Sequence, residues 1–194
     1  MPKILLHSCC GPCSIYPLEY LRNENFDIVG HFYNPNIHPY TEWQKRKDNY
    51  QWFMEKEGIK SIIEDDYDLE GFLQNVVHRE ANRCRYCYSM RLNRAAQIAR
   101  RGKFDAFTTT LLVSPFQKHQ MLKEIGEAVG EKYGVPFYYV DFRPGFKEAY
   151  MKAKETGHYT QQYCGCIYSE KERYMPKNKK KKGEKQLGSP SVYG

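Results

Sequence analysis

Apolar segments of strand length alternate along this chain with longer segments whose apolar residues recur at helical spacing. The strand-like runs fall at residues 3–7, 27–33, 59–63, 104–109 and 136–140. The helical segments are 14–23, 41–56, 68–78, 82–101, 119–133 and 146–156. Because strands and helices alternate, the pattern predicts an α/β fold built on a doubly wound, mostly parallel sheet of five strands.

The pattern also predicts one folded domain followed by a tail. A chain of 194 residues is long enough for a single core, and we place the α/β domain at residues 1–175. Residues 176–194 hold six lysines against one glutamate, with Gly, Ser and Pro among them, which predicts disorder. No stretch approaches a membrane span, and the N-terminal apolar run is too short for a secretory signal. We therefore expect a cytoplasmic protein with reduced thiols.

Polar or cysteine-bearing loops follow three of the predicted strands, at residues 8–14, 110–118 and 141–145. Ligands of parallel sheets bind beyond the carboxyl ends of the strands, so these loops are expected to meet at one edge. Asp141 opens the last loop, where it is a candidate metal ligand or proton donor. Its alternative role is a helix N-cap or turn residue ahead of Pro144.

The cysteines fall into three tight clusters that lie far apart in the sequence. These clusters are Cys9-Cys10-x-x-Cys13, Cys84-x-x-Cys87 and Cys164-x-Cys166. In a reducing compartment such spacings serve metal or thiol chemistry rather than a disulfide scaffold. Cys84 and Cys87 share one face near the start of a helix, whose N-terminus and flanking arginines favour the thiolate form that binds metals.

Four thiolates from Cys9, Cys10, Cys84 and Cys87 can hold a [4Fe-4S] cluster or a zinc ion. A structural zinc site would use only four ligands and leave three cysteines without a role, so the ligand count favours the iron–sulfur cluster. Cys13 is either a further ligand or a buried thiol.

The remaining pair and the acidic loop residue are the predicted catalytic residues. Cys164 and Cys166, with Asp141 nearby, would bind an additional mononuclear iron or relay electrons and protons as a dithiol. His7 precedes the first cysteine loop and is expected to be a packed core residue.

The charge of the chain is +7, but the tail accounts for +5 of it, so the domain itself is nearly balanced. Within the domain, seven of the eleven arginines lie between residues 79 and 101, where acidic partners are few. We expect this local basic surface, together with the tail, to bind RNA. The candidate contacts are Arg79, Arg83, Arg85, Arg91 and Arg94. The alternative is a solvated helix whose arginines form ion pairs.

Five motifs in this order resemble the cobalamin-independent epoxyqueuosine reductases across residues 3–170. They are LLHSCCGPCS at 5–14, RCRYC at 83–87, TTLLVSP at 109–115, DFR at 141–143 and QQYCGC at 161–166. Gly11 stands where many relatives are expected to carry alanine. The run from Ser114 to Lys118 also departs from the usual Ser-Pro-Tyr-Lys, which shifts the position of the lysine.

The resemblance implies the last step of queuosine synthesis, in which an epoxide on a modified guanine at the tRNA wobble position loses its oxygen as water. Two electrons and two protons are consumed. An iron–sulfur cluster supplies low-potential electrons, and an acid or a metal with an open position activates the oxygen. The implied partners are the tRNA anticodon stem-loop and an electron donor that the sequence does not identify.

The resemblance further implies an adenine-nucleotide-hydrolase-like fold, which tRNA-thiolating enzymes share. A sulfur-transfer enzyme of that fold would need ATP, and the first strand–helix loop here carries cysteines in place of a glycine-rich phosphate loop. Two further hypotheses are a non-catalytic, zinc-dependent RNA-binding module and a thiol relay that acts without RNA.

Overall fold

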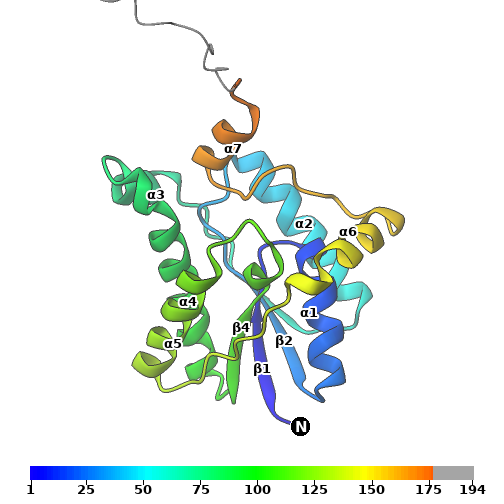
Figure 1. Cartoon of the computed structure of the whole chain (residues 1–194). Helices are drawn as coiled ribbons and strands as arrows, with labels where there is room; N and C mark the ends of the chain where they lie inside the picture. The colour runs from blue at the N-terminus through cyan, green and yellow to red at the C-terminus, as the bar shows by residue number, and fades with distance from the viewer. Residues whose placement is uncertain (177–194) are drawn as a thin grey trace, which may run out of the picture.

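The centre of the fold is a four-stranded parallel sheet (Figure 1). This computed structural model describes residues 1–176, so the predicted tail at 176–194 lies, except for its first residue, outside the described residues. The sheet order is β3-β2-β1-β4, and Leu5 in β1 pairs with Val29 in β2 and Phe107 in β4. The strands are β1 (Lys3–His7), β2 (Asp27–Phe32), β3 (Ser61–Ile63) and β4 (Ala106–Thr109).

The predicted α/β fold with a parallel sheet is confirmed, but the sheet has four strands instead of the expected five. Residues 136–140 run beside β4 and form a single parallel bridge between Phe107 and Phe137. Two backbone hydrogen bonds support it, from Phe107 N–H to Pro136 O (3.0 Å) and from Tyr138 N–H to Phe107 O (2.8 Å). β4 is only four residues long and Pro136 has no N–H to donate, so the ladder ends after one bridge.

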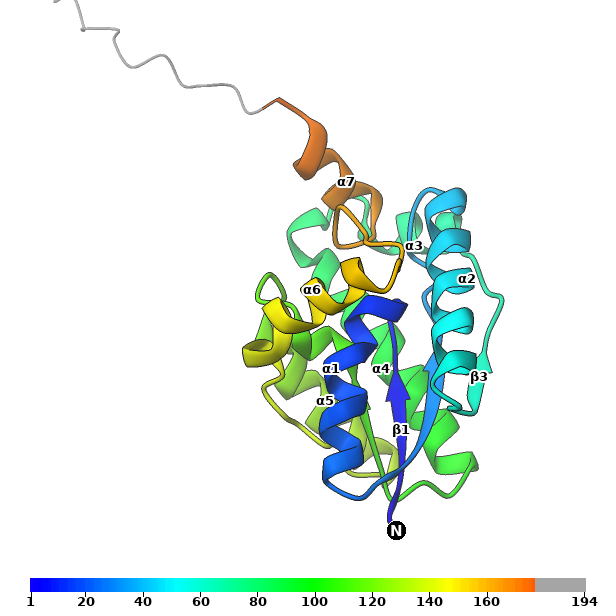
Figure 2. The ribbon, with the colours of Figure 1, turned by 90° about the vertical axis from the view of Figure 1, so that its right-hand side faces the viewer.

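Helices cover both faces of the sheet (Figure 2), which explains why the strands are apolar on both sides. One face packs against α1 (Gly11–Asn23), α2 (Tyr40–Lys56) and α6 (Phe146–Glu155). The other packs against α4 (Arg83–Arg101) and α5 (His119–Tyr133). α5 ends where Gly134 adopts the left-handed conformation, with φ of 66°. None of the helices in residues 1–176 combines the length and hydrophobicity of a membrane-spanning segment.

Two further helices, α3 (Leu69–Val76) and α7 (Ile167–Tyr174), lie beyond the carboxyl end of the sheet (Figure 1). α7 is absent from the sequence prediction, because its eight residues are mostly polar or aromatic and show no clear apolar stripe. Three short 3₁₀ turns complete the described chain, at Glu80–Asn82, Thr110–Val113 and Arg143–Gly145.

The order of the strands creates a crevice between two loops. The chain passes from β1 to β2 to β3 toward one edge, then returns so that β4 lies on the other side of β1. The strand order therefore reverses between β1 and β4, and the loops that leave these strands diverge. The loop after β1 contains Cys9 and Cys10, and the Thr110–Val113 turn follows β4.

Candidate active site

Three cysteine sulfurs converge where β1 meets α1. The Sγ atoms of Cys9, Cys10 and Cys13 all lie within 4.8 Å of one another, the one group of three or more such metal-ligating side chains in residues 1–176. Cys10 is the N-cap residue of α1 and Cys13 lies in its first turn. α1 begins at Gly11, three residues before the predicted start, because Pro12 suits the first turn of a helix. The helix N-terminus favours negative charge on these sulfurs.

Hydrogen bonds make Cys9 the thiolate of this group. Donation from Cys10, then from Cys13, holds the pKa of Cys9 well below its usual value despite burial, and Thr110 adds a weaker effect. A hydrogen bond with Cys10, then the one with Cys9, and burial raise the pKa of Cys13, and burial raises that of Cys10. Three sulfurs this close together are a donor set suited to a metal.

Four further thiols form a second group on α4 and on the loop before α7. Burial raises the pKa of Cys87, and negative charge at Cys166 and Cys84 raises it further. Cys164 is accessible from solvent, yet the protein packed around it raises the pKa of its thiol to about 11, with Cys87 as the next contributor. The Cys84/Cys87 and Cys164/Cys166 pairs therefore lie close enough for each to influence the titration of the other.

A buried arginine lies between the two thiol groups. Arg91 is 2% exposed and donates to Asn36 Oδ1 from Nε at 3.0 Å and from Nη2 at 2.7 Å. Its positive charge lowers the pKa of Cys9, Cys87 and Cys164. Among the described residues it forms no ion pair with a carboxylate. A buried cation without an anion is unfavourable, so Arg91 favours ionisation of the sulfurs around it.

A second buried arginine fixes the loop that carries Cys164. Arg46 on α2 is fully buried and donates to Cys164 O at 2.8 Å and to Tyr163 O at 2.9 Å. Its Nε also donates to Glu42 Oε1 at 2.7 Å, and Glu42 accepts from Tyr159 as well. One buried ion pair on α2 therefore holds the segment 159–164 against the sheet edge.

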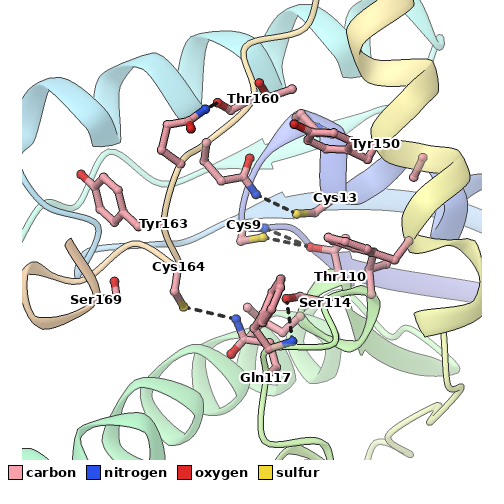
Figure 3. Close-up of a pocket in the computed structure, with 18 of the residues that line it drawn as sticks. Cys9, Cys13, Thr110, Ser114, Gln117, Tyr150, Thr160, Tyr163, Cys164 and Ser169 are labelled. Carbon is pink, nitrogen blue, oxygen red and sulfur yellow. Dashed lines mark hydrogen bonds between the residues drawn. The ribbon is translucent and has the colours of Figure 1, made fainter. Parts of the chain in front are cut away.

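A cavity of about 370 Å³ joins the two thiol groups. Cys9 and Cys13 line one side and Cys164 approaches from the other (Figure 3). Gln117 donates from Nε2 to Cys164 Sγ at 3.2 Å. Gln161 spans the first group, since its Oε1 lies 3.3 Å from Cys10 Sγ and its Nε2 donates to Cys13 Sγ at 3.1 Å. The cavity offers thiols and amide groups to one bound ligand.

The family model described as "Epoxyqueuosine reductase QueH" matches residues 4–172 of this chain. The chain belongs to the QueH family. A family member from Dehalococcoides mccartyi is 37% identical over 177 residues, which are 91% of this chain and 97% of that protein. One from Thermotoga maritima is 36% identical, over 89% of this chain and 93% of its own length. These matches confirm the resemblance that the motifs carry.

The fold has a more distant likeness among solved structures. The U34-tRNA thiolase NcsA from Methanococcus maripaludis, solved with its [4Fe-4S] cluster, superimposes with a TM-score of 0.58 at 17% identity. The match covers 87% of this chain and 61% of the thiolase. At this identity the likeness shows a common fold.

Asp141, the predicted acidic member of the QueH-type site, lies apart from the thiols. It is exposed, does not line the cavity, and accepts from Arg143 through the backbone N–H at 3.1 Å and through Nη2 at 2.6 Å. This guanidinium lowers the pKa of Asp141 to about 2. The contacts are those of a residue that stabilises its own turn.

The predicted RNA-binding arginines divide into different environments. Arg79 and Arg85 are exposed. Arg83 forms an ion pair with Glu172, and Arg94 forms one with Glu64. Arg91 corrects the sequence-based expectation, because its guanidinium is buried beside the thiols and cannot reach an RNA phosphate at the surface. Helical periodicity places Arg91 on the inner face of α4, which a count of charges does not reveal.

Glu64 contacts both Arg94 and His31, and this network is expected to stabilise the fold in a pH-dependent way. Glu64 Oε1 also lies 2.6 Å from His31 Nε2, and although partial burial opposes ionisation, these partners lower the pKa of Glu64 to about 2. Glu64→Gln is therefore expected to lower the free energy of unfolding by about 2 kcal/mol at pH 7. The lowered pKa contributes stability above the unfolded value of 4.5, and this contribution disappears as the pH falls through about 2.

Urea unfolding of both proteins at pH 7, 5 and 3 measures this effect. The difference between wild type and Glu64→Gln should shrink between pH 5 and pH 3, because the carboxyl of the unfolded state takes up a proton below about 4.5 while the native carboxyl stays ionised until about pH 2. A difference that stays constant with pH would show that the lost stability arises from packing instead of charge.

Several residues of the site escape sequence reasoning. Gln161 opens the QQYCGC run at 161–166 that the resemblance uses, and Thr110 lies in a loop that the strand pattern marks, so both had a signal. Arg46 had none, because it stands in a helix rich in charged residues, where an exposed side chain is the normal expectation. Asn36 was likewise unmarked within a turn.

Proposed function

We propose that this chain removes the epoxide oxygen of epoxyqueuosine in tRNA, the activity named for its family. The observation that carries the proposal is the convergence of Cys9, Cys13 and Cys164 on one cavity in a chain of the QueH family. Low-potential electrons and protons must meet at the epoxide, and thiols on two sides of one cavity suit that demand. The substrate is then a nucleotide of the anticodon loop, and a separate electron donor returns the enzyme to its reduced state.

We also propose that the fold is adenine-nucleotide-hydrolase-like, which the β3-β2-β1-β4 order supports.

We further propose that Cys9 and Cys10 are ligands of an iron–sulfur cluster and that Cys13 is the third. Cys9 and Cys10 belong both to the set predicted from the sequence and to the converging group. Their fit to an anionic, thiolate-ligated group is supported by the buried Arg91, which lacks a carboxylate partner among the described residues. A bound cluster of this type supplies low-potential electrons. The sequence-based set, with Cys84 and Cys87 in place of Cys13, predicts instead that iron is lost when Cys84 is replaced.

In this proposal the second thiol group serves redox chemistry or an additional iron. Cys84, Cys87, Cys164 and Cys166 offer four sulfurs, enough for either role. Asp141 is no longer included, since Arg143 occupies its carboxylate. Without a bound iron, Cys164 is protonated at neutral pH because its pKa is raised to about 11, and its Sγ faces the cavity. It is therefore placed to donate a proton to the departing oxygen, while Gln117 holds its sulfur in position.

The deciding experiment combines metal analysis with one turnover assay. Protein purified without oxygen should be brown and hold about four irons per chain, with matching sulfide. Incubated with a chemical reductant and epoxyqueuosine-bearing tRNA, it should yield a nucleoside lighter by one oxygen. A gain of sulfur that requires ATP would identify a thiolase instead. A colourless zinc protein that binds tRNA and leaves the epoxide intact would reject the enzymatic assignment.

A further inference from the structure

Three aromatic rings stand at the rim of the thiol cavity. Phe116 is 85% exposed, yet it lines the cavity together with Phe146 and Tyr150. The rings of Phe116 and Phe146 meet edge to face, with centroids 6.2 Å apart and planes inclined by 84°. Tyr150 follows Phe146 by four residues on α6, so both rings point from the same face of that helix. The rim therefore combines rings from two separate elements.

The exposure of Phe116 is built into its loop. The N–H of Phe116 donates to Ser114 Oγ at 3.3 Å, and the N–H of Gln117 donates to Ser114 O at 3.2 Å. The hydroxyl of Tyr88 donates to Gln117 Oε1 at 2.7 Å and accepts from the N–H of Lys118 at 3.2 Å. These bonds direct the Gln117 side chain to Cys164 and leave the neighbouring ring outside. A phenyl group this exposed adds little to the core, so its contact surface is available to a ligand.

We propose that Phe116, supported by Phe146 and Tyr150, is a stacking platform for an unpaired base of the RNA next to the nucleotide that enters the cavity. This inference rests on the proposed function and specifies how its substrate is held. Loop bases of RNA bind by stacking on aromatic side chains while polar groups contact their edges. The same rim carries Thr160 and Gln162 for base edges and Arg173 for a phosphate.

The test uses a synthetic, unmodified anticodon stem-loop with 2-aminopurine on the 3′ side of the wobble nucleotide. Stacking quenches 2-aminopurine fluorescence, so binding to wild type should quench it. Phe116→Leu keeps an apolar side chain but removes the ring. It should abolish the quenching and weaken binding by about 5- to 150-fold, the range for loss of one base–aromatic stack. Phe116→Tyr should restore both within about twofold, because it restores the ring.

Trp52→Leu is the matched control, since Trp52 is an aromatic residue on α2 that is 42% exposed and does not line the cavity. It should bind and quench like wild type. If Phe116→Leu binds the stem-loop and quenches its fluorescence like wild type, while wild-type protein deoxygenates tRNA, Phe116 is not a stacking platform and the proposed function stands. If wild type neither binds the stem-loop nor deoxygenates tRNA, the stacking platform and the proposed function are both overturned. Iron content, measured on every variant, should not change.

Discussion

Cys9→Ala is expected to remove bound iron and deoxygenation activity together. Cys9 is the sulfur whose thiolate form the site stabilises most, through donation from Cys10, Cys13 and Thr110 and through the charge of Arg91. Alanine removes this sulfur and leaves only two of the three converging ligands. Iron and acid-labile sulfide per chain, the visible absorbance and the loss of epoxide oxygen from tRNA should all fall to background.

Two companion variants identify the third ligand. If the converging group holds the cluster, Cys13→Ala should lose most of the iron and Cys84→Ala should retain the cluster. The reverse result would restore the set predicted from the sequence and show that Cys13 is a buried thiol. Unfolding midpoints of the three variants, measured after their iron is removed, serve as the control, because a ligand role requires iron loss from a protein that still folds.

Arg46→Gln is expected to lower the free energy of unfolding by about 3–5 kcal/mol, the usual cost of removing one partner of a buried ion pair. Glu42 is 7% exposed and would keep its charge in the interior without a cation. The carbonyl oxygens of Tyr163 and Cys164 would lose their donors at the same time. Activity should fall as well, since the segment that presents Cys164 to the cavity would no longer be fixed. Urea unfolding of the iron-free, reduced protein measures the stability.

The double variant Glu42→Gln/Arg46→Gln separates the ion pair from packing. Removing both charges eliminates the uncompensated buried carboxylate, so the double variant should be more stable than Arg46→Gln alone. Its Cys164 carbonyl would still lack the arginine donor, so activity should stay low. A double variant that is less stable than both single variants, with additive losses, would show that Glu42 and Arg46 contribute independently.

Much of the architecture was determined by local patterns in the sequence. Apolar periodicity and Gly134 located α5 at both ends, and the same pattern located β1, because strand and helix periods depend on neighbouring residues. The cysteine spacings indicated metal or thiol chemistry, and the alternation of elements predicted that loops after parallel strands would share an edge. Each of these conclusions required only residues close together in the chain.

The tertiary structure alone decided which residues meet. Residues 136–140 fit the strand pattern, yet pairing depends on the length of β4 and on Pro136. Arg46 and Arg91 look like surface charges in sequence, but the packing of α2 and α4 buries them against thiols; Arg46 bonds to a carbonyl 118 residues away. Cys13 lies beside Cys9 because α1 begins at Gly11 and carries Cys13 in its first turn. The contacts of Arg46 and Arg91 with residues far along the chain depend on how the elements pack, which no local period encodes.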